Sequence, residues 1–108
     1  MNMTAREIAK DFLSKMNPSG WNGIGDKPND LDTRIITYKI DDDVELDLSI
    51  ENIAFEDDED PEWTTCCELR WCDDGELLEI FSSDSVCDER EIAFTIVDCC
   101  GRGRISFE

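Results

Sequence analysis

The sequence predicts an α+β fold in which an N-terminal helix packs on an antiparallel sheet of about five strands, in two layers. Three observations lead to this prediction. One stretch near the start has the apolar spacing of a helix, and from Arg34 onward apolar residues recur at every second position, as in strands. Short acidic segments separate the alternating stretches, which is typical of tight turns between antiparallel strands. With 108 residues, the chain is expected to form a single domain over 1–108.

The helix is predicted over residues 4–16, TAREIAKDFLSKM. Thr4 and Glu7 have the spacing of a capping box at its start. The apolar residues of the predicted helix recur at i, i+3 and i+4 spacing and form one stripe, which consists of Ala5, Ile8, Ala9, Phe12, Leu13 and Met16. Asp11 and Lys15 are spaced for a favourable i,i+4 ion pair. The stripe is expected to cover one face of the sheet.

A long connection is predicted over residues 17–33, which contain three glycines and two prolines. Connections of this length without regular structure are uncommon and often functional. Trp21 lies within it. Two interpretations of Trp21 remain open, which are packing against the sheet and presentation to a partner.

The antiparallel sheet is predicted over residues 34–108. Its five strands are expected at the following ranges: 34–40, 44–55, 63–72, 76–83 and 91–100. In the second strand, the apolar set stays in phase as far as residue 55 only if a bulge or bend occurs near residues 51–53. Asp41-Asp42-Asp43 and Asp73-Asp74-Gly75 are expected to form turns. Residues 101–108 are expected to extend the fifth strand or to add a short edge strand.

The charge is concentrated in the predicted sheet. Residues 1–40 hold six basic and five acidic side chains, whereas residues 41–108 hold four basic and 23 acidic ones. Such a surface repels phosphate, so direct binding to nucleic acid is not expected. No secretory signal or membrane span is recognised, and we expect a cytoplasmic protein that does not bind a membrane.

The six cysteines are expected to be reduced, structural residues. Cys66-Cys67 and Cys99-Cys100 are adjacent pairs, and no C-x-x-C motif occurs. Adjacent residues of a strand face opposite sides, so each pair contributes at most one sulfur to a shared site. We therefore predict no metal site and no cofactor.

An enzymatic function is not predicted. The chain has no histidine, and a cysteine nucleophile needs a base or a positive charge nearby. Carboxylate pairs are expected by chance among 28 acids, so they identify no active site.

The remaining interpretation is that the acids meet a basic partner. At the charge spacing of B-DNA, the net negative charge of residues 41–108 occupies roughly 32 Å of duplex, about the diameter of a domain of this size. In size, acidity, helix-then-sheet order and lack of catalytic motifs, the chain resembles the small acidic inhibitors of phages and mobile elements, which include DNA mimics, anti-restriction proteins and anti-CRISPR proteins.

This resemblance implies a non-enzymatic inhibitor that binds the basic nucleic-acid-binding surface of a protein or nucleoprotein complex. An immunity protein or antitoxin that blocks a nuclease toxin has the same electrostatics, and an acidic structural module is the third possibility. The run AFEDDEDPEW and the turn before the second strand suggest where contact occurs. The predicted partner-binding residues are Asp41, Asp42, Asp43, Glu45, Asp47, Glu56, Asp57, Asp58, Glu59, Asp60, Glu62 and Trp63, with core packing as the alternative role of Trp63.

Overall fold

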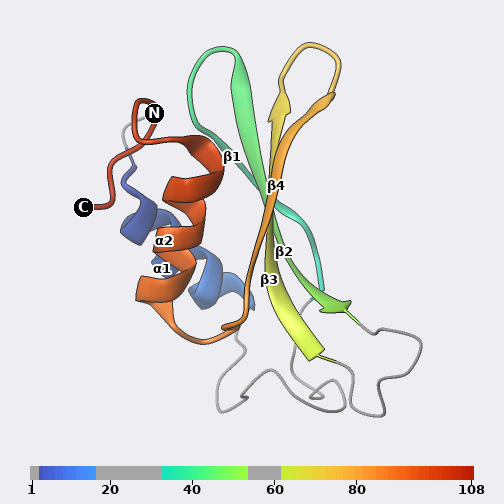
Figure 1. The fold of residues 1–108 in the computed structure, drawn as a ribbon, viewed down its shortest axis with the longest axis vertical. Coiled ribbons are helices and arrows are strands. Elements are labelled where there is room, and N and C mark those ends of the chain that lie inside the picture. Colours follow the sequence, from blue (N-terminus) through green and yellow to red (C-terminus); the bar gives the residue numbers. More distant parts are fainter. Residues whose placement is uncertain (1–2, 17–32, 54–61) are drawn as a thin grey trace.

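The computed structural model describes residues 3–16, 33–53 and 62–108. In chain order, these residues form α1 (Ala5–Met16), β1 (Ile36–Lys39), β2 (Val44–Ile53), β3 (Glu62–Trp71), β4 (Leu77–Ser83) and α2 (Glu89–Cys100). The predicted α+β class is confirmed. Both helices lie on the same side of the sheet, so the protein has a helical layer and a sheet layer (Figure 1). Neither described helix combines the length and the apolar character that a membrane span requires.

The sheet of the described residues has four antiparallel strands in the order β1-β2-β3-β4, rather than five. Its longest pairing joins β2 to β3, from Val44 opposite Trp71 to Ile53 opposite Glu62. The sequence required a bulge or bend near residues 51–53 only if the apolar set stays in phase as far as residue 55. Every residue of β2 has a partner in β3, so the pairing shows no bulge as far as Ile53, and residues 54–55 lie outside the described residues. The register shift occurs instead where β3 pairs with β4.

Helix α1 begins and continues as its local sequence predicts. The Glu7 N–H donates to Thr4 Oγ1 at 3.2 Å, and the Thr4 N–H donates to Glu7 Oε1 at 3.1 Å. This reciprocal pair is the capping box. The Lys15 ammonium lies 3.0 Å from the Asp11 carboxylate, which confirms the predicted ion pair.

Residues 91–100, predicted as the fifth strand, belong to helix α2 instead. The Asp88 carboxylate caps this helix by accepting hydrogen bonds from the N–H groups of Arg90 and Glu91 at 3.0 and 3.2 Å. The helix ends at Gly101, whose φ of 90° suits glycine and whose N–H donates to the Val97 carbonyl. The segment contains β-branched residues, which favour strands over helices. Capping, together with the burial of one helical face, outweighs that propensity.

The tail over residues 101–108 forms no strand, contrary to the prediction. It turns over residues 101–104 and runs back to the start of α1. There the carbonyls of Ser106 and Phe107 accept hydrogen bonds from the N–H groups of Ala5 and Arg6 at 2.8 and 3.0 Å. The tail thus satisfies two of the donors that the first turn of a helix leaves without an intrahelical partner.

The core is built from the alternating residues of β2 and the apolar faces of the helices. The predicted inward set of β2 is buried and consists of Val44, Leu46, Leu48 and Ile50. Helix α2 contacts β3 and β4, and α1 contacts α2. Side chains from both helices belong to the same buried cluster as the strand residues. The sheet face opposite the helices, here called the outer face, carries the other alternating set of β2 and its partners on β3.

Candidate functional site

Two acidic turns lie side by side at one end of the sheet. The β1–β2 turn contains Asp41, Asp42 and Asp43, and the β3–β4 turn contains Asp73 and Asp74. In an antiparallel order, both turns fall at the same end, as the two adjacent loops at the top of Figure 1 show. The Cys72 N–H donates to the Asp43 carbonyl at 2.8 Å, so the turns are in direct contact. We call the carboxylates at this end the hairpin-end cluster, which consists of Asp41, Asp42, Asp43, Glu45, Asp73, Asp74 and Glu76.

The acids of the hairpin-end cluster have two kinds of role. Asp41 Oδ1 accepts hydrogen bonds from the N–H groups of Asp43 and Val44 at 2.8 and 3.3 Å, and Asp74 Oδ1 accepts one from the Glu76 N–H at 2.9 Å. These two side chains therefore hold the turns in shape. The side chains of Asp42, Asp43 and Asp73 are exposed. The turns thus present carboxylates from a fixed backbone.

Arg70 balances part of the charge on the outer face. Its guanidinium lies 2.6 Å from the Glu68 carboxylate and 3.6 Å from that of Asp47. The Thr37 hydroxyl also donates to Asp47 at 2.7 Å. The Asp47 side chain is only 19% exposed. It is therefore less available to a partner than the exposed acids of the two turns.

The structure brings some of the predicted site residues together and separates others. Asp41, Asp42, Asp43 and Glu45 lie in the hairpin-end cluster, and Asp47 follows on the outer face. Glu62 and Trp63 lie at the other end of β3, and a strand of this length spans about 30 Å.

The remaining predicted residues differ in what the structure says of them. Trp63 is half-buried and packs against the core. The predicted residues Glu56, Asp57, Asp58, Glu59 and Asp60 lie outside the described residues. Their part in partner binding stays a prediction.

The predicted partner-binding residues do not include Asp73, Asp74 and Glu76, but the sequence leaves the acidic turn over residues 73–76 open as another contact, as it does residues 84–91. A signal for them was present, because residues 73–75 are predicted to form a hairpin turn. In consecutive antiparallel strands, every second turn lies at the same end of the sheet. Applying this rule to the predicted strands places the 73–75 turn at the same end of the sheet as the 41–43 turn, although only the strand order decides whether the two turns touch.

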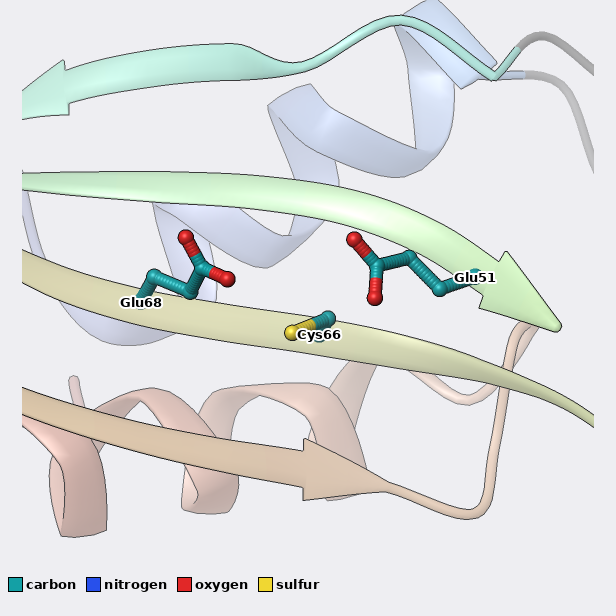
Figure 2. Close-up of side chains that lie close together, drawn as sticks. All are labelled: Glu51, Cys66 and Glu68. Carbon is teal, nitrogen blue, oxygen red and sulfur yellow. The ribbon is translucent and has the colours of Figure 1, made fainter. Parts of the chain in front are cut away.

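A second cluster joins a thiol to two carboxylates on the outer face. Figure 2 shows Glu51 of β2 with Cys66 and Glu68 of β3, all pointing into the same space. One ligand atom from each side chain lies within 4.8 Å of the other two. Cys66 is only 3% exposed. Burial first, and then the charges of Glu51 and Glu68, raise the pKa of the Cys66 thiol to about 11.

The other cysteines follow the prediction in part. All six lie in the described part of the chain, and none forms a disulfide. Cys66 and Cys67 face opposite sides of β3, as predicted for adjacent strand residues. Cys99 and Cys100 lie on a helix instead and are both buried. The Cys99 thiol approaches the Cys67 carbonyl at 3.5 Å, which places it against β3.

Chemically, the hairpin-end cluster is a surface for cationic groups. It offers exposed carboxylates held by hydrogen-bonded turns, with Arg104 paired to Asp41 at 3.7 Å. Comparison with protein-family models, curated proteins and solved structures found no match to this chain. The inference of function therefore rests on the residues and their geometry.

Proposed function

We propose that this protein is a non-enzymatic, cytoplasmic acidic inhibitor that binds the basic nucleic-acid-binding surface of a protein or nucleoprotein complex. The observation that carries the proposal is the contact between the two acidic turns. Residues 41–43 and 73–74 are distant in sequence but adjacent in space, joined by the hydrogen bond from Cys72 to Asp43. Together they form one acidic surface larger than either turn alone.

The charge density of the chain supports a nucleic-acid-like surface. The net charge is −18, and the longest dimension of the protein is 41 Å. A B-DNA duplex of that length carries about 24 phosphate charges. The protein therefore approaches the linear charge density of the ligand whose site it is proposed to occupy. Charge of this density also accelerates encounter with a basic partner.

The fixed geometry of the turns supports specific binding over simple solubility. Asp41 and Asp74 hold the turn backbones through hydrogen bonds. A preorganised surface loses less conformational entropy on binding than flexible acidic chains do. A protein that needs only solubility gains nothing from placing its acids in two touching turns.

The experiment compares two variants of equal net charge. The first, D42K/D43K/D73K, reverses exposed acids of the hairpin-end cluster and keeps the hydrogen bonds made by Asp41 and Asp74. The second, D84K/E91K/D98K, reverses three exposed acids outside the cluster and serves as the matched control. Partners are captured from a bacterial lysate on immobilised wild-type protein at low salt and eluted with duplex DNA. Association of each variant with the eluted partner is then measured.

The proposal expects an eluted partner whose nucleic-acid binding is blocked by the wild-type protein. D42K/D43K/D73K should associate at least about tenfold more slowly at low salt, with a weaker salt dependence, while the control stays close to wild type. Equal slowing in both variants would indicate a diffuse charge effect and contradict a defined surface. If the partner still binds DNA when it is saturated with the wild-type protein, the proposal that the protein mimics nucleic acid is wrong.

A third variant tests the acidic run outside the described residues. D57K/D58K/D60K changes the net charge by the same amount as the other two variants. If it alone loses binding, the contact lies at residues 56–60 and the hairpin-end cluster is not the site. An eluted partner that is a single nuclease, inhibited at its active site, would favour the immunity-protein alternative. If DNA elutes no partner from the immobilised protein, the result favours an acidic structural module.

A further inference from the structure

The cluster of Glu51, Cys66 and Glu68 has features that the acidic turns lack. Its three side chains come from two adjacent strands and converge from the same sheet face (Figure 2). Its sulfur is buried, whereas Glu51 is exposed, so the cluster is open to solvent on one side. A buried thiol between two carboxylates has no evident benefit for folding, because the charges oppose ionisation of the sulfur. Among the described residues, Arg70 is the cation that acts on this group.

Thr64 adds an independent observation. It is only 3% exposed, and its Oγ1 has no hydrogen-bond partner among the described residues. Thr64 lies directly opposite Glu51 in the strand pairing and two residues before Cys66, so its side chain leaves the same sheet face beside both. A buried hydroxyl without a partner costs about 1–3 kcal/mol. A ligand in the cluster, or a water bound to that ligand, removes this cost.

Each carboxylate of the cluster is already oriented by a neighbour. The Ser49 hydroxyl donates to Glu51 Oε1 at 3.3 Å, and the Arg70 guanidinium donates to Glu68 Oε2 at 2.6 Å. Each of these two contacts uses one carboxylate oxygen, and within the described part of the chain the second oxygen can bind a ligand. Such outer contacts are typical of carboxylates that bind metal ions.

We propose that Glu51, Cys66 and Glu68 bind a zinc ion, with Thr64 beside the fourth position. Ligand atoms around tetrahedral zinc stand about 3.3–3.6 Å apart, so the cluster closes on the ion by small side-chain movements. Zinc accepts sulfur and carboxylate oxygen together, whereas calcium and magnesium prefer oxygen ligands alone. As the sulfur–zinc bond forms, the thiol releases its proton to solvent. The positive charges of zinc and Arg70 then balance the thiolate and two carboxylates.

This proposal departs from the prediction that the chain holds no metal. For zinc, that prediction considered a site of four thiolates, whereas this site needs one thiolate and two carboxylates. The proposal is independent of the proposed inhibitor function, because the cluster lies outside the two acidic turns.

The experiment measures the binding of zinc to the reduced, full-length protein by calorimetry, with excess magnesium present to saturate the acidic surface. Cadmium is used in parallel, because a cadmium–thiolate bond gives a charge-transfer band in the ultraviolet. The wild-type protein should bind one zinc ion and show this band with cadmium. Cys66→Ser should abolish the band and weaken zinc binding at least about hundredfold. Ser49→Ala removes an outer contact and should weaken it about tenfold.

Two further variants keep the result unambiguous. Glu51→Gln changes an exposed side chain and preserves its shape, so it should lose zinc binding without unfolding the protein. Cys72→Ser is the matched control, because Cys72 is an exposed thiol close to Glu45, Asp41 and Asp73, and it should bind zinc like the wild type. The proposal is wrong if no saturable binding of one ion occurs. It is also wrong if Cys66→Ser keeps the band or if Cys72→Ser loses it.

Discussion

Tyr38 connects the first strand to the first helix through its hydroxyl. Tyr38 is 5% exposed, and its hydroxyl donates to Asp11 Oδ2 at 2.7 Å. The same oxygen lies 3.0 Å from the Lys15 ammonium. The hydrogen bond from Tyr38, and then the contacts with Lys15, lower the pKa of Asp11. Burial and the Asp11 carboxylate raise the pKa of Tyr38.

Replacing Tyr38 with phenylalanine tests this connection. Tyr38→Phe should lower the free energy of unfolding at pH 7 by about 0.5–1.5 kcal/mol, because one hydrogen bond is lost while the ring still packs. The pKa of Asp11 is lower in the folded state than in the unfolded state, so its ionised carboxylate contributes to the free energy of unfolding. This contribution is complete above the unfolded pKa of about 3.9 and is lost as pH falls through the folded pKa. In urea unfolding, the difference between wild type and variant should therefore shrink below about pH 4. A difference that is constant from pH 7 to pH 2 would contradict this role for Asp11.

Helix α2 depends on a cap that the residues before it supply. Asp88 accepts two backbone hydrogen bonds, and its own N–H donates to Ser85 Oγ at 2.7 Å. Glu89 and Glu91 lie in the first turn, where the helix dipole favours negative charge. Because α2 contacts β3, β4 and α1, a loss at its start affects the whole core.

Removing this cap gives a prediction for the helix. Asp88→Ala should lower the free energy of unfolding by about 0.5–2 kcal/mol, because the N–H groups of Arg90 and Glu91 lose their acceptor. Asp84→Ala is the control, since Asp84 is an exposed acid in the same connection and its removal changes the net charge equally. Denaturant unfolding of both variants measures the difference. If both change stability equally, the effect comes from charge and not from the cap.

The net charge of −18 acts on the protein as a unit. In the hairpin-end cluster, two acidic turns joined by a backbone hydrogen bond bring their carboxylates to one end of the sheet, and Arg104 pairs with Asp41. Crowded like charges destabilise the compact state through self-repulsion. Under the proposed function, binding of a basic surface to the acids compensates this loss of stability.

Salt should therefore stabilise the free protein. Raising sodium chloride from about 0.05 M to about 0.5 M shortens the Debye length to a few ångströms and should raise the free energy of unfolding in urea. The variant D42K/D43K/D73K should be more stable than wild type at low salt and should respond less to added salt. Stability that decreases with salt would mean that attractive ion pairs, such as those of Arg70, outweigh the repulsion.

Much of the fold is readable from local sequence. The capping box, the i,i+4 ion pair and the apolar stripe identify helix α1, because all three involve residues one turn apart. Alternation identifies β1 to β4, and each strand end within the described residues lies about two residues or fewer from its predicted position. This pattern is also local, because it involves every second residue. The error at α2 was avoidable in part, because Asp88 and Glu91 have the spacing of a cap and the apolar residues that follow have helical spacing.

By itself, the sequence determined the α+β class, helix α1, the four strands β1 to β4 and the abundance of acid, since these depend on composition and on neighbours along the chain. The tertiary structure alone decided which acids meet. Contact between the 41–43 and 73–74 turns depends on the order of the strands, and the approach of Glu51 to Cys66 and Glu68 depends on their register. A shift of one residue in the pairing of β2 would turn Glu51 to the opposite face and separate it from Cys66 and Glu68. Local propensity does not encode such a register, because packing of the whole core selects it.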